Sequence, residues 1–167
     1  MNNIKHEETK DLKMETEKRI ERMDKEMKAQ KDFVLTTFEN TENYNQMVIM
    51  KNISAVAKCE HHKCEFQCIV HAGYLPTKRL IGASKFNRIT RKYLNLAEET
   101  LQERATQQIL NDFMELDPLG AMVIIEGKHS CIMHRGVRDN STMITSAVGG
   151  VFQTDALARQ EFLTLIK

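Results

Sequence analysis

Two short clusters of cysteine and histidine carry the clearest chemical signal in this sequence. The first is Cys-Glu-His-His at residues 59–62, and the second is His-Ser-Cys at residues 129–131. Zinc prefers thiolate and imidazole ligands, and a catalytic zinc keeps three protein ligands so that water can take the fourth position. Cys59 and His62 are three residues apart, and Cys131 can complete the set from a distant strand. These residue types predict a catalytic Zn²⁺ site.

The same clusters hold two imidazoles that the metal does not need. His61 and His129 each lie beside a predicted ligand and remain free to move protons. Taken alone, the first cluster is only slightly better explained by a metal site than by chance, because a CxxH pattern is frequent. The second cluster favours the metal, since it would place zinc, an activated water and two imidazoles together.

A carboxylate in the second half of the chain is a candidate for recognising a base. Glu103, beside Gln102, could accept two N–H bonds from an amidine-like edge such as guanine presents. The alternative is an ordinary charge on the surface of a helix, and the local sequence alone favours that alternative.

Several cations could together bind a polyphosphate. A hydroxyl and two cations lie on the first turns of a predicted helix, whose N-terminal amides also favour anions. Arginine side chains elsewhere in the chain can bind phosphate oxygens in a bidentate manner. The residues concerned are Ser84, Lys85, Arg88, Arg104 and Arg135. Each of these cations taken singly is also explained as a solvated surface charge.

Length, charge and cysteine content set limits on the class of protein. The chain has 167 residues, which is one domain with a substantial core, and a formal net charge of +1. This balance gives no general reason to expect nucleic acid or an anionic membrane as a partner. Without a long apolar run or a signal peptide, we expect a cytoplasmic protein with reduced thiols. Cys64 and Cys68 could join Cys59 in a second metal site, but we interpret them as inert.

The beginning of the chain differs in composition from the rest. Residues 1 to about 32 are dense in charges of both signs and carry only a thin apolar stripe at helical spacing. We expect a mostly solvated helix that needs a partner surface to be stable. The chain is accordingly divided into a charged N-terminal helical segment, residues 1–40, and a domain with the candidate site, residues 41–167.

The second part of the chain alternates between strand-like and helix-like patterns. Strands are predicted at about 47–57, 66–75, 122–125 and 132–152, and helices from 84, over 98–116 and from 155. Ser84 is a good N-cap type for the first of these helices. The order predicts an α+β domain, with an antiparallel sheet and helices on one side.

Ordered motifs over most of the chain resemble those of the GTP cyclohydrolase I family. They are Cys-Glu-His-His at 59–62, Gly-Tyr-Leu-Pro at 73–76, Ile-Gly-Ala-Ser-Lys at 81–85, Gln-Glu-Arg at 102–104, His-Ser-Cys at 129–131 and Arg-Gly-Val at 135–137. The match runs in order from about residue 44 to the end. The resemblance implies the tunnelling fold (T-fold), in which the sheets of several subunits join into a barrel with active sites between subunits.

The resemblance also implies a role for each candidate residue. The zinc ligands would be Cys59, His62 and Cys131. Catalytic roles would fall to His61, His129, Ser84 and Gln102. Glu103 would anchor the guanine ring, and the triphosphate would bind Lys85, Arg88, Arg104 and Arg135.

The implied reaction is the zinc-dependent hydrolysis and rearrangement of GTP to 7,8-dihydroneopterin triphosphate with release of formate. The implied assembly is a homo-oligomer, a decamer of two pentameric rings, with no nucleic-acid or membrane partner. One alternative is a relative that stops at the ring-opened formamidopyrimidine product. The other is a non-catalytic T-fold subunit that binds a purine or a partner protein.

Overall fold

The computed structural model describes residues 12–29 and 32–167. The elements in chain order are α1 (Leu12–Ala29), β1 (Thr37–Glu39), β2 (Val48–Cys59), β3 (Glu65–Leu75), β4 (Arg79–Ile81), α2 (Ala83–Tyr93), β5 (Glu99–Thr100), α3 (Gln102–Met114), β6 (Gly120–His129), α4 (Ser130–Met133), β7 (Met143–Gly150), α5 (Val151–Thr154) and α6 (Ala156–Ile166). This is the predicted α+β class.

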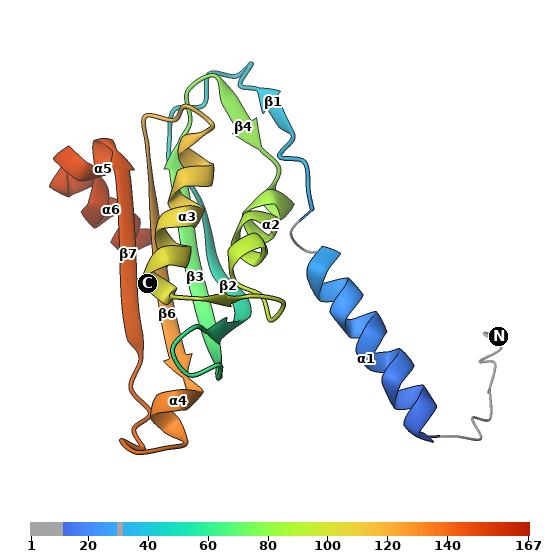
Figure 1. Cartoon of the computed structure of the whole chain (residues 1–167). Coiled ribbons are helices and arrows are strands. Elements are labelled where there is room, and N and C mark those ends of the chain that lie inside the picture. The colour runs from blue at the N-terminus through green and yellow to red at the C-terminus, as the bar shows by residue number, and fades with distance from the viewer. Residues whose placement is uncertain (1–11, 30–31) are drawn as a thin grey trace, which may run out of the picture.

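Five strands form one curled sheet in the order β5-β2-β3-β6-β7 (Figure 1). The three pairings from β2 to β7 are antiparallel, and β3 pairs with β6 from Phe66 opposite His129 to Leu75 opposite Gly120. However, β5 runs parallel to the end of β2. The sheet is therefore mixed, which corrects the predicted antiparallel sheet. A strand of two residues is too short to produce a periodic signal in the sequence.

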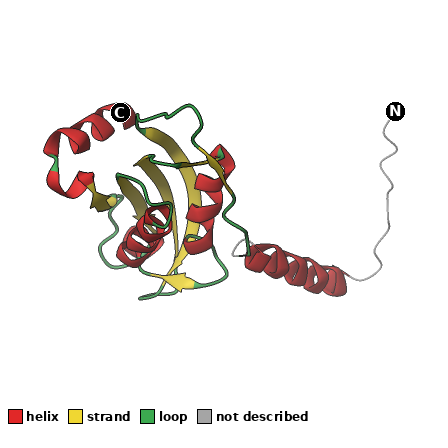
Figure 2. Ribbon diagram, turned by 90° about the horizontal axis from the view of Figure 1, so that it is seen from above, coloured by secondary structure: helices red, strands yellow, loops and turns green. Residues whose placement is uncertain are grey.

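Helices lie on both faces of this sheet, whereas the sequence predicted helices on one side. Side chains of a strand alternate between faces, so Ile125 joins the main core with α2 and α3 while Met122 and Ile124 point the other way. On that second face, Phe152 of α5 and Phe162 of α6 form a smaller core with them. Figure 2 shows α5 and α6 at one end of the sheet, apart from the other helices.

Several predicted element boundaries are wrong in ways that affect the candidate site. Helix α2 begins at Ala83 after Gly82, which makes no side-chain cap, so Ser84 lies in the first turn and is not the N-cap. Helix α3 covers 102–114 and is shorter than the predicted 98–116. The predicted strand at 132–152 is a one-turn helix, a loop and β7. The apolar residues that suggested a longer strand belong mainly to α4 and β7, at the two ends of the predicted range.

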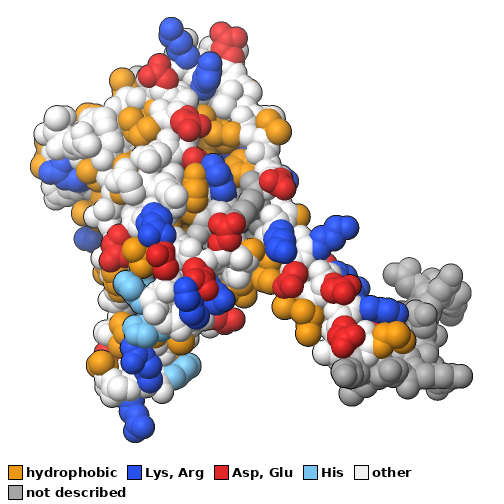
Figure 3. All heavy atoms as spheres, viewed as in Figure 1, with side chains coloured by type: hydrophobic (Ala, Val, Ile, Leu, Met, Phe, Trp, Pro, Cys, Tyr) orange, Lys and Arg blue, Asp and Glu red, His pale blue; other side chains and the backbone are white. Residues whose placement is uncertain are grey.

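In the N-terminal segment, residues 12–29 form helix α1, which stands away from the sheet (Figure 1). Its side chains are mostly exposed, including Ile20 and Met23, and Figure 3 shows acidic and basic groups interspersed along it. Residues 33–39 are not part of a solvated helix, because Phe33 and Leu35 pack against the main core and β1 pairs with β4. Residues 1–11, 30 and 31 of the predicted helical segment lie outside the described residues. Among the residues that the structure describes, no helix combines the length and apolar character required to cross a membrane.

Candidate metal centre and substrate site

Two thiols and one imidazole meet at the end of the sheet where β2 stops and β3 starts. Cys59 is the last residue of β2, His129 is the last of β6, and Cys131 lies on α4 directly after it. Their potential ligand atoms lie within 4.8 Å of one another. Burial raises the pKa of the Cys131 thiol, and the neighbouring Cys59 and Cys64 raise it further. A divalent cation would reverse this, because it favours the thiolate form. The group therefore fits a metal cofactor.

The third predicted ligand, His62, lies outside this group. It is exposed in the five-residue connection between β2 and β3, where the backbone is closed by a bond from the Cys59 N–H to the Cys64 carbonyl. The Nε2 atom of His62 contacts the guanidinium of Arg135. A guanidinium can only donate, so the Nε2 lone pair accepts, and this is a lone pair that a metal could use. His61 is exposed beside it, with ring centroids 6.3 Å apart.

Gln102 holds His129 in one orientation. The His129 Nε2 and Gln102 Oε1 atoms are 2.9 Å apart, and the Gln102 amide group donates to the Ile125 carbonyl at 3.1 Å and the Met143 carbonyl at 3.0 Å. It also lies 3.1 Å from the Thr145 hydroxyl. Because the amide oxygen can only accept, His129 donates through Nε2–H, which leaves the Nδ1 lone pair available in the neutral ring.

The surroundings of His129 fix the ring further. It stacks on Phe66, with centroids 4.3 Å apart and an interplanar angle of 5°. Burial lowers the pKa of His129, while the charge of Glu103 raises it. A Cβ atom added to Gly127 would lie 2.0 Å from the Gln102 amide oxygen, so only glycine leaves room for this amide. Sequence reasoning missed Phe66 and Gly127, because both occupy ordinary strand positions that carry no reactive group.

The remaining polar candidates near this end lie on or opposite α3. Glu103 is exposed on the first turn, next to the buried Gln102. Arg104 forms an ion pair with Glu60, whose carboxyl has a pKa lowered mainly by that guanidinium. Glu60 belongs to the predicted Cys-Glu-His-His motif, so the structure joins this motif to Gln-Glu-Arg in space.

The predicted phosphate-binding residues at the start of α2 lie towards the other end of β3. The Tyr74 hydroxyl, near the end of β3, accepts from the Ile81 N–H at 3.1 Å, just before α2 begins. The 11 residues of β3 span about 35 Å. One chain therefore does not bring Ser84, Lys85 and Arg88 to the metal centre.

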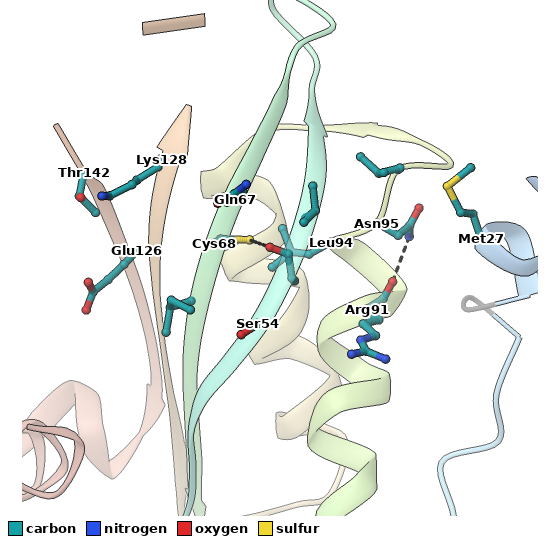
Figure 4. Close-up of a pocket in the computed structure, with 14 residues that line it drawn as sticks. Met27, Ser54, Gln67, Cys68, Arg91, Leu94, Asn95, Glu126, Lys128 and Thr142 are labelled. Carbon is teal, nitrogen blue, oxygen red and sulfur yellow. Dashed lines mark hydrogen bonds between the residues drawn. The ribbon is translucent and has the colours of Figure 1, made fainter. Parts of the chain in front are cut away.

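A cavity of about 510 Å³ lies beside β2 and β3 and contains none of the predicted site residues (Figure 4). Its lining includes Gln67, Cys68 and Leu94, and Met27 of α1 closes one side. Cys68 donates to the Ala55 carbonyl at 3.4 Å, and burial raises its pKa to about 12. Such a thiol stays protonated at neutral pH and acts as a packing residue.

Comparisons with known proteins agree with this geometry. A family model described as GTP cyclohydrolase I matches residues 1–167. The chain is 40% identical over 156 residues to GTP cyclohydrolase 1 of Aquifex aeolicus, covering 92% of this chain and 83% of that protein. It is 44% identical over 128 residues to GTP cyclohydrolase 1 of Rattus norvegicus, covering 75% of this chain and 52% of the rat protein. The chain thus spans about half the length of the rat relative.

A solved structure shares the fold. The archaeosine synthase QueF-Like in the apo form superposes with a TM-score of 0.52 at 16% identity, covering 62% of this chain and 93% of that chain. At this identity the likeness concerns the fold alone, and it confirms the predicted tunnelling fold.

Proposed function

The chain belongs to the GTP cyclohydrolase I family, and we propose that it hydrolyses and rearranges GTP to 7,8-dihydroneopterin triphosphate with release of formate. The observation that carries this proposal is that the thiols of Cys59 and Cys131 meet the buried, oriented imidazole of His129, because the thiols can hold a metal beside a group that can move a proton. The chemistry requires water to attack the C8 atom of the purine, and such a centre is suited to that step.

We propose zinc as the metal and Cys59, His62 and Cys131 as its ligands. Two thiolates and an imidazole are a typical zinc donor set. When bound, zinc would lower the pKa of a water molecule towards neutrality and so supply the attacking hydroxide. His62 would exchange its contact with Arg135 for the metal, which would free that guanidinium for a phosphate group.

His129 is proposed to handle the proton at the imidazole ring of the base. Its Nε2–H is committed to Gln102, so Nδ1 is the atom that faces the chemistry. The lowered pKa keeps the ring neutral at pH 7, and Nδ1 can then take a proton from the attacking water and deliver it to N7. His61 and Ser84 would assist the later opening and rearrangement of the ribose. Gln102 acts by orienting His129.

Recognition of GTP would use Glu103 for the guanine edge and four cations for the triphosphate, namely Lys85, Arg88, Arg104 and Arg135. Arg104 would exchange Glu60 for a phosphate oxygen. Because the start of α2 lies far along β3 from the metal centre, a second copy would have to supply Lys85 and Arg88. This separation supports a homo-oligomer with sites between subunits, and a decamer of two pentameric rings is our proposal.

The direct test is to incubate the zinc-loaded protein with GTP and follow formate release together with pterin fluorescence. We expect both signals in equal amounts, and neither with ATP. Formate without a pterin would indicate the alternative that stops at the ring-opened formamidopyrimidine. Binding of GTP without formate would contradict the proposed enzyme and favour a non-catalytic T-fold subunit. Light scattering of the same sample tests the assembly.

A further inference from the structure

Lys85 is held by the segment that joins α1 to β1. Its ammonium group donates to the Val34 carbonyl at 2.8 Å and lies 5.9 Å from the centre of the Phe33 ring. These two contacts come from adjacent residues and act on the same charged group. The backbone oxygen fixes its position, and the aromatic face favours a cation next to it.

This segment is itself attached to the body of the domain. Phe33 and Leu35 pack against the main core, and Thr37–Glu39 then pairs with Arg79–Ile81, directly before α2. Asn40 closes the arrangement, because its side-chain amide donates to the Tyr44 and Thr77 carbonyls, both at 2.8 Å. Residues 33–40 are therefore tied to the same end of the sheet from which Lys85 projects.

A lysine held in this way keeps its capacity to bind an anion. An ammonium group has three donors, and the Val34 carbonyl occupies one, so two remain for phosphate oxygens. A free lysine side chain loses conformational entropy when it binds, and ordering it beforehand reduces that loss. Arg88 is exposed on the same helix and offers a second cation.

We propose that Phe33, together with the Val34 carbonyl, is a positioning element that orders Lys85 for the triphosphate of the substrate. This proposal rests on the proposed function, since it assigns Lys85 to the triphosphate. Phe33 does not touch the substrate and acts through Lys85. The segment before β1 thereby contributes to substrate affinity, although it carries no cation at the site.

The first experiment distinguishes two possible roles of Phe33, namely the contact of its aromatic ring with Lys85 and its apolar packing against the core. In Phe33→Leu the apolar contact with the core is retained and the ring is lost, and we expect KM for GTP to rise about two- to fivefold with kcat unchanged. Phe33→Tyr should restore the original KM. Leu35→Ala is the matched control, because Leu35 packs on the same core and has no aromatic ring to offer Lys85. Equal rises in KM for Phe33→Leu and Leu35→Ala would overturn the proposal.

A double-mutant cycle then tests whether the effect passes through Lys85. In a Lys85→Ala background, Phe33→Leu should cause no further rise in KM. A rise of the same size as in the original protein would mean that Phe33 acts by another route and would overturn the proposal.

Binding of inorganic tripolyphosphate, measured by calorimetry, separates this proposal from the proposed function. We expect Kd to be about two- to fivefold higher for Phe33→Leu than for the unsubstituted protein and Phe33→Tyr. A protein that binds tripolyphosphate in this graded way but releases no formate from GTP would contradict only the proposed function. Equal Kd values for Phe33→Leu and Phe33→Tyr would contradict the positioning role, whatever the activity.

Discussion

The two ends of the central sheet differ in how tightly they hold their proposed functional side chains. At the end with Cys59 and Cys131, the buried amide of Gln102 and the stacked ring of Phe66 fix His129 in one orientation. Gly127 leaves the space that this amide needs. At the other end, Lys85 lies on the surface of α2 and is steadied by one carbonyl and one aromatic ring. Proton transfer depends on the position of a single atom, whereas attraction of a triphosphate tolerates a flexible charge. The difference predicts that substitutions at the first end cost far more activity.

The largest effect is expected from Cys131→Ala, which removes a proposed metal ligand. Formate release should fall by more than about a thousandfold, because water at the site regains its ordinary pKa. Metal analysis of the purified variant should find no tightly bound zinc. Cys64→Ala is the control, since Cys64 is a neighbouring thiol outside the Cys59–His129–Cys131 group. Full zinc content in Cys131→Ala would disprove the assignment.

Glu103→Gln should reduce the preference for GTP over ATP, by about a hundredfold in kcat/KM. A site built to pair with substrate N–H groups leaves polar groups unmatched once its acceptor is changed. Glu115→Gln is a matched control, because Glu115 is an exposed carboxylate at the opposite end of α3. If the selectivity stays the same, Glu103 is only a surface charge.

Gly127→Ala should disturb His129 without touching any reactive group. The added Cβ would lie 2.0 Å from the Gln102 amide oxygen, so that amide and the imidazole bonded to it must move. We expect kcat to fall about ten- to a hundredfold, as when the partner of a functional histidine is lost. The free energy of unfolding should fall by about 1–3 kcal/mol.

The control for this substitution comes from the other end of the sheet. Gly82 precedes α2, and a Cβ there meets nothing within 4 Å. Gly82→Ala should therefore leave kcat nearly unchanged. Equal losses of kcat in Gly127→Ala and Gly82→Ala would contradict the prediction that substitutions at the metal end of the sheet cost more activity.

The smallest effect is expected from shortening the N-terminus, in two steps. A chain beginning at Asp32 lacks α1 and should bind zinc, assemble and turn over GTP with unchanged KM, because the proposed cations all lie downstream. A chain beginning at Glu39 also lacks Phe33 and Val34, and its KM should rise several-fold. Light scattering and kinetics on both would test the predicted division near residue 40. A zinc-free monomer in either case would place the removed residues in the assembly core.

Part of the site was predictable because its residue types are rare in combination. Two of the three predicted ligands, Cys59 and Cys131, meet in the structure, but the imidazole whose nitrogen lies within 4.8 Å of their sulfur atoms is that of His129 and not that of His62. Gln102 was identified as a functional residue, but its bonds to two carbonyls across β6 and β7 depend on strand register. Register is a property of pairing between distant segments, and a single sequence does not specify it locally.

The errors in the fold have different origins. The predicted strand at 132–152 joined α4, the following loop and β7, although residues 134–142 are polar apart from Gly136 and Val137 and so mark a break in the apolar pattern. Helices on both faces were missed because Met122 and Ile124 belong to the predicted strand at 122–125, in which all four residues are apolar, and such a run does not reveal which elements cover each face. The contact between Lys85 and Val34 involves a backbone oxygen, which has no signature in a sequence.

The four thiols of this chain differ in exposure, so their reactivity towards an alkylating reagent can distinguish metal loss from unfolding. Cys68 is buried and remains protonated, so an alkylating reagent at neutral pH would not modify it while the protein is folded. Cys64 and Cys131 are partly exposed, and Cys59 is buried. A metal-loaded sample should be alkylated at Cys64 alone, and a chelated one at Cys131 as well. Modification at all four positions would indicate unfolding and not metal loss alone. Mass spectrometry of the alkylated protein would therefore measure both the loss of metal and the unfolding of the chain.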